Sequence, residues 1–162
     1  MEKSDSIIII PTYNEKENIE NIIRAVFGLE KFFHILIIED NSPDGTATIV
    51  RKLQTEFPDR LFMVERKGKL GLGTAYIAGF KWALAHNYQY IFEMDADFSH
   101  NPQDLPRLYK ACAEDGSDVA IGSRYVSGVN VVNWPMGRVL MSYFASCLLY
   151  TSPSPRDMRR SR

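Results

Sequence analysis

The chain has 162 residues, of which 45% are hydrophobic and 24% are charged, so it can bury one core but is too short for two full-sized domains. Its 19 basic and 20 acidic side chains give a net charge of -1, which excludes binding to nucleic acid through a strongly positive overall charge. The two cysteines lack metal-ligand or CxxC spacing, and the apolar run near the N-terminus is too short for a signal peptide or a membrane span.

Five apolar runs of strand length, at residues 7–10, 35–38, 61–64, 90–94 and 119–121, are separated by segments with helical periodicity. The first of these segments places Ile19, Ile22, Ile23 and Val26 on one face, and later helices are expected near residues 74–85 and 102–115. The first two runs are apolar at successive positions, which is typical of parallel strands covered on both faces. The sequence therefore predicts an α/β fold with a mostly parallel central sheet.

The composition changes abruptly near residue 151 to Thr, Ser, Pro, Arg and Asp, with Met158 the one apolar residue that follows. Such a segment cannot bury enough apolar surface to fold. We expect one domain over residues 1–150 and a disordered tail over residues 151–162.

In parallel α/β sheets, ligands bind beyond the carboxyl ends of the strands, and the segments there are polar in this chain. The most informative segment contains Asp95 and Asp97, directly after the fourth apolar run. In an extended backbone, residues two apart point to the same side, so both carboxylates can converge on Mg²⁺ or Mn²⁺ and a diphosphate. The alternative is that this DxD sequence caps the next helix or lies in a solvated turn.

Asp40 follows the second run in the same way, where a carboxylate can accept hydrogen bonds from a base or a ribose. The neighbouring residues 42–45 also form a strong turn sequence, with Asp44 or Thr46 as the N-cap of the next helix. The loop at residues 67–75 combines three glycines with two lysines and suits a diphosphate at a helix start. It lacks the dinucleotide-binding fingerprint, because Tyr76 stands where the third glycine belongs.

The segment after the first run contains Tyr13 and Glu15, which can stack on a nucleoside and hydrogen-bond to it. The structural alternative makes Asn14 a helix cap and Glu15 an acidic residue of the first helical turn.

Five motifs in order, IIIIPTYNEKENI, IIEDNSPDGT, KGKLGLGTAY, MDADFSHNPQDLP and GSRYVSG, resemble the family 2 glycosyltransferases, and most closely the dolichol-phosphate (polyprenol-phosphate) mannosyltransferases. The resemblance implies a GT-A fold and an enzyme that transfers mannose from GDP-mannose to a polyprenyl phosphate. It implies that the nucleotide lies near Pro11, Tyr13, Glu15, Ile38 and Asp40, and the metal and diphosphate near Asp95, Ala96 and Asp97. Arg124 corresponds to a phosphate-binding arginine, and Trp134, Arg138 and Ser142 match a W-x3-R-x3-S stretch whose Arg and Ser receive the acceptor phosphate.

The chain departs from the family pattern at Gly128-Val129-Asn130 and again in the tail, where the family continues with more fold. We expect a peripheral protein at the cytoplasmic face of a membrane, with a nucleotide sugar and a polyprenyl phosphate as partners and no nucleic acid. A phosphate monoester is largely ionised near neutral pH and needs no general base, so direct displacement would invert the anomeric centre. Two alternatives remain open, namely a family 2 transferase that uses a UDP-sugar and a nucleotide-binding module without turnover.

Overall fold

The computed structural model describes residues 4–122, 136, 137, 140–142, 144 and 145. The chain divides into two units, residues 1–121 and residues 122–162. All the strands named below belong to the first unit, and the described residues of the second unit from 136 onward are helical. The expected tail, residues 151–162, lies outside the described residues.

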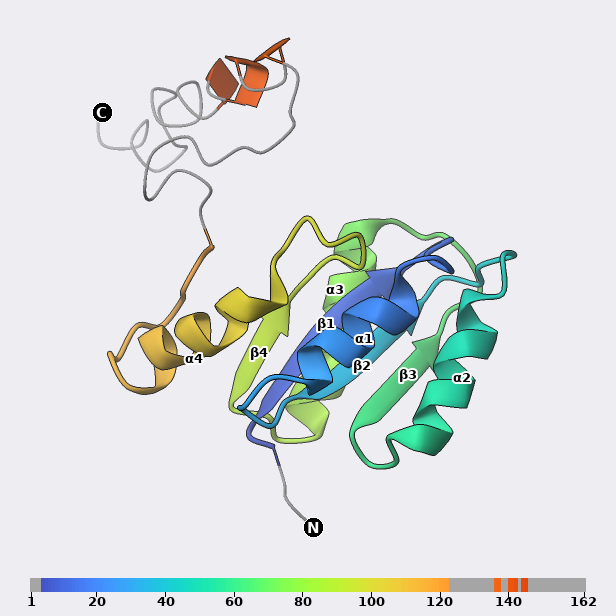
Figure 1. The fold of residues 1–162 in the computed structure, drawn as a ribbon, viewed down its shortest axis with the longest axis horizontal. Coiled ribbons are helices and arrows are strands. Elements are labelled where there is room, and N and C mark those ends of the chain that lie inside the picture. Colours follow the sequence, from blue (N-terminus) through green and yellow to red (C-terminus); the bar gives the residue numbers. More distant parts are fainter. Residues whose placement is uncertain (1–3, 123–135, 138–139, 143, 146–162) are drawn as a thin grey trace, which may run out of the picture. The chain divides into compact units, whose positions relative to one another are not determined.

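The first unit is built on a parallel sheet of four strands, β1 (Ser6–Thr12), β2 (His34–Glu39), β3 (Leu61–Glu65) and β4 (Tyr90–Glu93), in the order β3-β2-β1-β4. The helices are α1 (Ile19–Phe27), α2 (Thr46–Glu56), α3 (Leu72–Ala85), α4 (Leu105–Ala113) and the short 3-10 helix η1 (Pro102–Asp104). Strands and helices alternate along the chain, as Figure 1 shows. The predicted α/β fold with a parallel sheet is confirmed.

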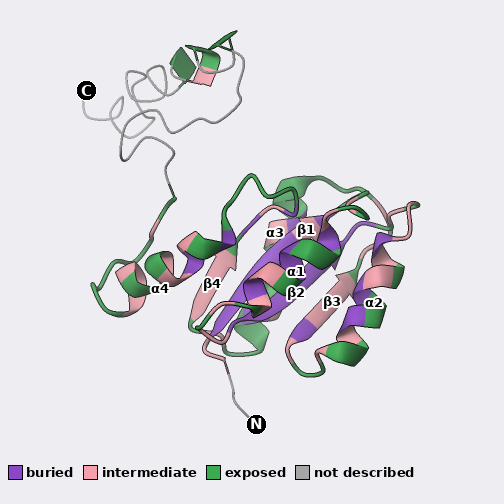
Figure 2. Cartoon of the chain, viewed as in Figure 1, coloured by how far each residue is buried: buried purple, intermediate pink, exposed green. Residues whose placement is uncertain are grey.

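Helices cover both faces of the sheet, which explains why the central strands are apolar at every position. Ile8 and Ile10 of β1 pack with residues of α1, α2 and α4, whereas Ile7 and Ile9 face the opposite way and pack with α3. All four isoleucines are fully buried, and β1 and β2 are the most continuously buried elements of the sheet (Figure 2). Each such side chain contributes about 1.5–3 kcal/mol by leaving water.

Gly79 allows α3 to lie close against β1. A Cβ atom at this position would stand 2.6 Å from Cγ2 of Ile9, well inside van der Waals contact. The glycine therefore sets the distance between the helix and the central strand, and with it the position of the N-terminal end of α3.

The prediction of a fifth strand is wrong, because residues 119–121 form no strand in the structure. Val119 and Ile121 are 73% and 83% exposed. β4 has only four residues and pairs with β1 on one side. Residues 119–121 could form few hydrogen bonds with a strand as short as β4. Their apolar composition alone therefore does not make them a strand.

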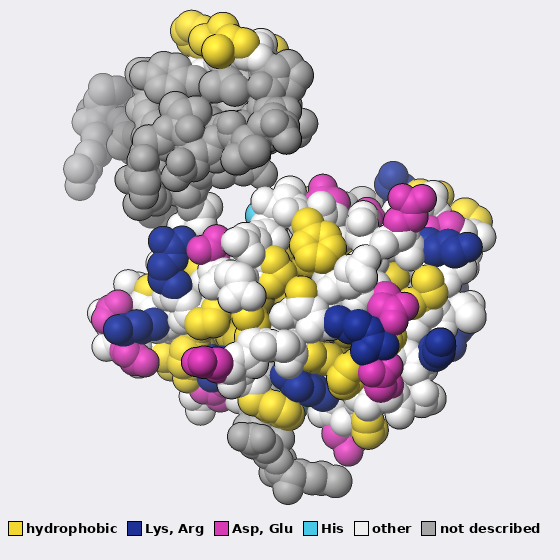
Figure 3. Space-filling view, viewed as in Figure 1, with side chains coloured by type: hydrophobic (Ala, Val, Ile, Leu, Met, Phe, Trp, Pro, Cys, Tyr) yellow, Lys and Arg dark blue, Asp and Glu magenta, His cyan; other side chains and the backbone are white. Residues whose placement is uncertain are grey.

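On the face that carries α1 and α2, lysine and arginine side chains are interspersed with aspartate and glutamate (Figure 3). Arg24, for example, pairs with Glu20 and Glu56. This face therefore carries no extended patch of a single sign. Among the residues that the structure describes, no helix has the length and apolar character required to cross a membrane.

Candidate functional site

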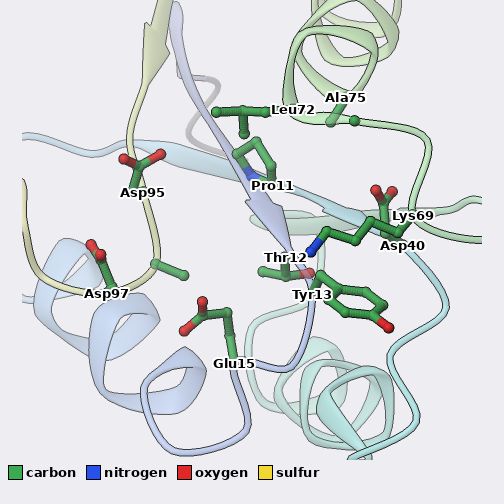
Figure 4. Close-up of a pocket in the computed structure, with 12 residues that line it drawn as sticks. Pro11, Thr12, Tyr13, Glu15, Asp40, Lys69, Leu72, Ala75, Asp95 and Asp97 are labelled. Carbon is green, nitrogen blue, oxygen red and sulfur yellow. The ribbon is translucent and has the colours of Figure 1, made fainter.

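A pocket of about 270 Å³ opens at the carboxyl end of the sheet. Its walls come from the end of β1, from the segments that follow the four strands and from the start of α3. Figure 4 shows Asp95 and Asp97 on one side, Tyr13, Lys69 and Asp40 on the other, and Glu15 pointing between them. The complete lining consists of Pro11, Thr12, Tyr13, Glu15, Asp40, Lys69, Gly71, Leu72, Ala75, Asp95, Ala96 and Asp97.

The segment after β1 is held in place by the turn that precedes α2. The backbone N–H groups of residues 14, 15 and 16 donate to Ser42 Oγ, Thr46 Oγ1 and Asp44 Oδ2 at 3.0–3.1 Å. The side chain of Glu39 in turn accepts from the N–H groups of residues 41 and 42. These polar side chains therefore fix the loop that presents Tyr13 and Glu15 to the pocket.

Two local alternatives for this region are wrong. Asn14 does not cap α1, which begins at Ile19 after Asn18; it adopts a left-handed conformation with φ 61°. The acidic residue in the first turn of α1 is Glu20 rather than Glu15. At α2, the N-cap position is Gly45 with φ 92°, a conformation that favours glycine, and the Asp44 carboxylate accepts from the N–H and hydroxyl of Thr46.

Asp95 and Asp97 line the same pocket although the backbone between them is not extended. β4 ends at Glu93, and residues 96 and 97 form a turn. The Tyr76 hydroxyl donates to Asp95 Oδ1 at 3.2 Å, and the backbone N–H of Ser99 donates to Asp97 Oδ1 at 2.9 Å. The DxD segment is thus a turn, as the structural alternative predicted. This turn nevertheless places both carboxylates in the pocket.

The protonation states around the DxD turn suit a cation. Hydrogen bonds from the side chain and backbone of Ser99 lower the pKa of Asp97, which keeps this carboxylate charged at neutral pH. Burial and the nearby Asp95 carboxylate raise the pKa of Tyr76, so its hydroxyl remains a donor. Among the described residues, no cluster of three or more His, Cys, Asp or Glu side chains could hold a metal ion. A cation here would need further oxygens from its ligand or from water.

Asp40 lies at the other side of the pocket and is buried against Arg66. The Arg66 Nε donates to Asp40 Oδ1 at 2.5 Å, and its Nη2 donates to Asp40 Oδ2 at 2.6 Å. Both side chains are less than 10% exposed. Arg66 directly follows β3, so the carboxyl ends of β2 and β3 are joined by this bidentate ion pair.

The glycine-rich loop closes the same side of the pocket. Lys69 Nζ lies 4.6 Å from the centre of the Tyr13 ring, within the range of a cation–π interaction. Gly71 has φ 96° and precedes α3, whose first residue is Leu72. The predicted loop therefore reaches the pocket with one of its two lysines.

Seven of the predicted site residues line the pocket together, namely Pro11, Tyr13, Glu15, Asp40, Asp95, Ala96 and Asp97. Ile38 does not, because its side chain is fully buried in the core beneath α3. Arg124, Trp134 and Arg138 lie outside the described residues. Ser142 is described as part of a helix in the second unit, and its relation to the pocket stays a prediction.

Arg66 and Tyr76 are functional candidates that the sequence did not predict. Arg66 immediately precedes the glycine-rich loop at residues 67–75, and Tyr76 follows that loop as the residue that stands in place of the third glycine. The position of Arg66 among the polar residues after the third apolar run was the available signal. Nothing in the spacing of Tyr76 indicated a contact with Asp95, 19 residues away.

A family model and several curated proteins match this chain. Residues 7–158 match the model of Glycosyl transferase family 2, a match that continues past residue 150 into the tail that was expected to depart from the family pattern. The chain is 47% identical over 141 residues to the polyprenol monophosphomannose synthase of Mycolicibacterium smegmatis, covering 87% of this chain and 53% of that protein. It is 41% identical over 140 residues to the undecaprenyl-phosphate mannosyltransferase of Micrococcus luteus, covering 86% and 56%.

A third relative, the dolichol-phosphate mannosyltransferase of Pyrococcus furiosus, is 41% identical over 139 residues, with 83% of this chain and 37% of that protein covered. The chain thus spans about half the length, or less, of these curated relatives. Among solved structures, S. aureus TarS (residues 1–349) superposes with a TM-score of 0.52 at 20% identity, over 65% of this chain and 32% of that one. This likeness supports the predicted GT-A fold. The family match covers most of the sequence, and the chain belongs to Glycosyl transferase family 2.

Proposed function

We propose that this chain forms the donor-binding part of a mannosyltransferase that moves mannose from GDP-mannose to a polyprenyl phosphate. The observation that carries the proposal is the pocket, in which Asp95 and Asp97 face Tyr13 and Asp40 across the carboxyl ends of parallel strands. A nucleotide sugar has an aromatic base at one end and a charged diphosphate at the other. The two sides of the pocket match these two ends.

The choice of sugar and acceptor comes from the names of the relatives, whereas GDP as the nucleotide comes from the resemblance of the sequence motifs. All three are named for mannose transfer or for a phosphomannose product, and their names specify polyprenol, undecaprenyl or dolichol lipids. The pocket of about 270 Å³ is smaller than most sites for ligands of this size, about 300–1,000 Å³. The chain spans about half the length of these relatives, so the transfer activity is proposed for a chain of their full length.

Mg²⁺ or Mn²⁺ fits the chemistry of the DxD turn. Asp95 and Asp97 supply hard carboxylate oxygens, and these keep acceptor capacity beyond the hydrogen bonds from Tyr76 and Ser99. Mg²⁺ is commonly held by one or two carboxylates together with substrate phosphates and water. When bound, such a cation would offset the negative charge of the diphosphate leaving group.

The acceptor side of the proposal rests on sequence. Arg124, Arg138 and Ser142 would receive the lipid phosphate, since guanidinium groups bind phosphate oxygens in bidentate fashion. An ionised phosphate can attack C1 of the sugar without a general base, and direct attack inverts that centre. A lipid acceptor would keep the enzyme at a membrane surface, as a peripheral protein at its cytoplasmic face.

Nucleotide binding is the first test, because it requires only the described pocket. Calorimetric titration of the chain with GDP, GDP-mannose, UDP and UDP-N-acetylglucosamine, each with and without Mn²⁺, should show metal-dependent binding that favours the guanine nucleotides. Tighter binding of the UDP compounds would instead support the alternative that the chain is a family 2 transferase that uses a UDP-sugar. Absence of binding to all four would contradict the proposal.

Transfer is the second test and belongs to a chain extended to the length of the relatives. Radiolabelled GDP-mannose with polyprenyl phosphate should give a lipid-linked product with inverted configuration. Transfer to free sugars or to proteins, but not to polyprenyl phosphate, would refute the acceptor. Binding of GDP without any transfer by the longer chain would identify a nucleotide-binding module.

A further inference from the structure

We propose that Arg66 is a positioning residue of the donor site, which holds Asp40 in the orientation needed to read the base and links it to the glycine-rich loop that contains Lys69. The inference rests on the proposed function and extends it to a residue that does not itself line the pocket. It starts from the bidentate ion pair between Arg66 and Asp40.

The ion pair leaves Asp40 able to receive a ligand. Arg66 donates one hydrogen bond to each carboxylate oxygen, whereas a carboxylate offers about four lone-pair sites. Asp40 also lines the pocket while its side chain is only 8% exposed. Each oxygen therefore keeps acceptor capacity, and the small exposed part of the carboxylate faces the pocket.

The orientation that Arg66 imposes suits a base that donates one hydrogen bond to Asp40. A planar guanidinium that binds both oxygens fixes the plane of the carboxylate and occupies the lone pairs that converge between the two oxygens. The lone pairs that remain point outward on opposite sides, so a base N–H donates to one of them. A fixed carboxylate accepts this hydrogen bond without losing rotational freedom on binding, which strengthens binding of the base.

Arg66 also contacts the loop that closes the pocket. Its Nη1 donates to Thr74 Oγ1 at 2.7 Å, and its Nη2 lies 3.4 Å from the carbonyl oxygen of Gly71. The Thr74 hydroxyl is in addition within hydrogen-bond distance of the carbonyl oxygens of Leu70 and Gly71, at 3.0 and 2.7 Å. The loop containing Lys69 is therefore connected through one guanidinium to the carboxylate that faces the base.

The chain offers a matched control in Arg24. Its Nη1 and Nη2 donate to the two oxygens of Glu56 at 2.6 and 2.7 Å, so it forms the same type of bidentate pair. The side chains of Arg24 and Glu56 are 43% and 46% exposed, on helices α1 and α2, and neither lines the pocket. Substitutions at Arg24 report the general effect of losing such a pair.

The experiment compares Arg66→Lys and Arg66→Met with Arg24→Lys and Arg24→Met by titration with GDP and with UDP in the presence of Mn²⁺. We expect both Arg66 variants to bind GDP and UDP at least about tenfold more weakly, because neither lysine nor methionine can form the planar pair. The Arg24 variants should match the wild type. Asp40→Asn combined with Arg66→Met should bind GDP no more weakly than Asp40→Asn alone, since the two residues act as a unit.

Thr74→Val provides a second test, because it alters an exposed residue and leaves the ion pair between Arg66 and Asp40 intact. It removes the acceptor of Nη1 and should weaken GDP binding about two- to fivefold, less than either Arg66 substitution. The inference is overturned if Arg66→Lys binds GDP within twofold of the wild type, or if the effects of the Asp40 and Arg66 substitutions on GDP binding are additive. Failure of the wild-type chain to bind any nucleotide would overturn the proposed function itself, which is a different result.

Discussion

Replacing Gly79 with alanine tests the contact that sets the position of α3. A Cβ atom there would lie 2.6 Å from Cγ2 and 2.9 Å from Cδ1 of Ile9. Ile9 is fully buried in β1, which is paired with β2 on one side and with β4 on the other, so it has little room to move. Gly79→Ala must therefore shift either the isoleucine side chain or the helix.

Two opposing effects decide the magnitude. An extra carbon in a well-packed core costs about 1–3 kcal/mol, and alanine in a helix interior is favoured over glycine by about 1 kcal/mol. With two atoms of Ile9 inside 3 Å, the cost lies in the upper part of its range. We expect Gly79→Ala to lower the free energy of unfolding by about 1–2 kcal/mol, measured by urea denaturation followed by circular dichroism.

Gly73 provides the control within the same helix. A Cβ atom at this exposed position would meet no atom within 4 Å, so Gly73→Ala should raise the free energy of unfolding by about 0.4–1 kcal/mol. The helix that Gly79→Ala displaces carries Ala75 to the pocket, and GDP binding should weaken as well. If Gly79→Ala stabilises the chain as Gly73→Ala does, the packing of α3 against β1 described above is wrong.

Three further predictions concern the DxD turn and a buried histidine. Asp97→Asn should weaken Mn²⁺-dependent GDP binding by at least about tenfold in calorimetry, and unchanged metal dependence would contradict its role as a ligand. Tyr76→Phe removes the donor to Asp95 and should weaken the same binding by up to about tenfold, at a cost of no more than about 1 kcal/mol in the free energy of unfolding; equal GDP affinity would show that the hydroxyl is not needed. Burial lowers the pKa of His34 below its ordinary 6.5, so the unfolded chain binds the proton more readily and stability should fall as the pH decreases below about 6.5. His34→Leu should abolish that dependence in urea denaturation from pH 7.5 to 5, and an identical slope in both proteins would refute the assignment.

The elements that could be predicted from the sequence are those whose signal is local. Ile7–Ile10 and Ile35–Ile38 are unbroken apolar runs, and the structure places both in strands buried on two faces. Helix α1 has its apolar residues at helical spacing and was equally predictable. Residues 119–121 carry the same apolar signal over only three positions, too few to form a strand without a suitable neighbour.

The site was predictable where position along the chain determines position in space. Residues that follow β1, β2 and β4 must meet at one edge of a parallel sheet, and Tyr13, Asp40, Asp95 and Asp97 do meet there. The ion pair of Arg66 with Asp40 was not predictable in this way, because it depends on side-chain directions at two strand ends 26 residues apart. Nor did periodicity indicate that Ser42 and Asp44 hold the backbone of the preceding loop.

The charges around the pocket constrain what it can bind. Four carboxylates line it, those of Glu15, Asp40, Asp95 and Asp97, against one ammonium group, that of Lys69. Among the described residues, Arg66 pairs with Asp40, but the ion pairs include none of the other three carboxylates.

A diphosphate brought beside unpaired carboxylates would be repelled, by about 4 kcal/mol for two unit charges 4 Å apart at an effective dielectric constant of about 20. One lysine cannot offset three carboxylates and a diphosphate. A divalent cation neutralises the charges of Asp95 and Asp97 and can bind the phosphate oxygens directly, whereas Asp40, already paired with Arg66, can face a neutral base. The charge distribution by itself therefore predicts that GDP binding should be strongly metal-dependent and that the dependence should arise at the DxD turn rather than at Asp40.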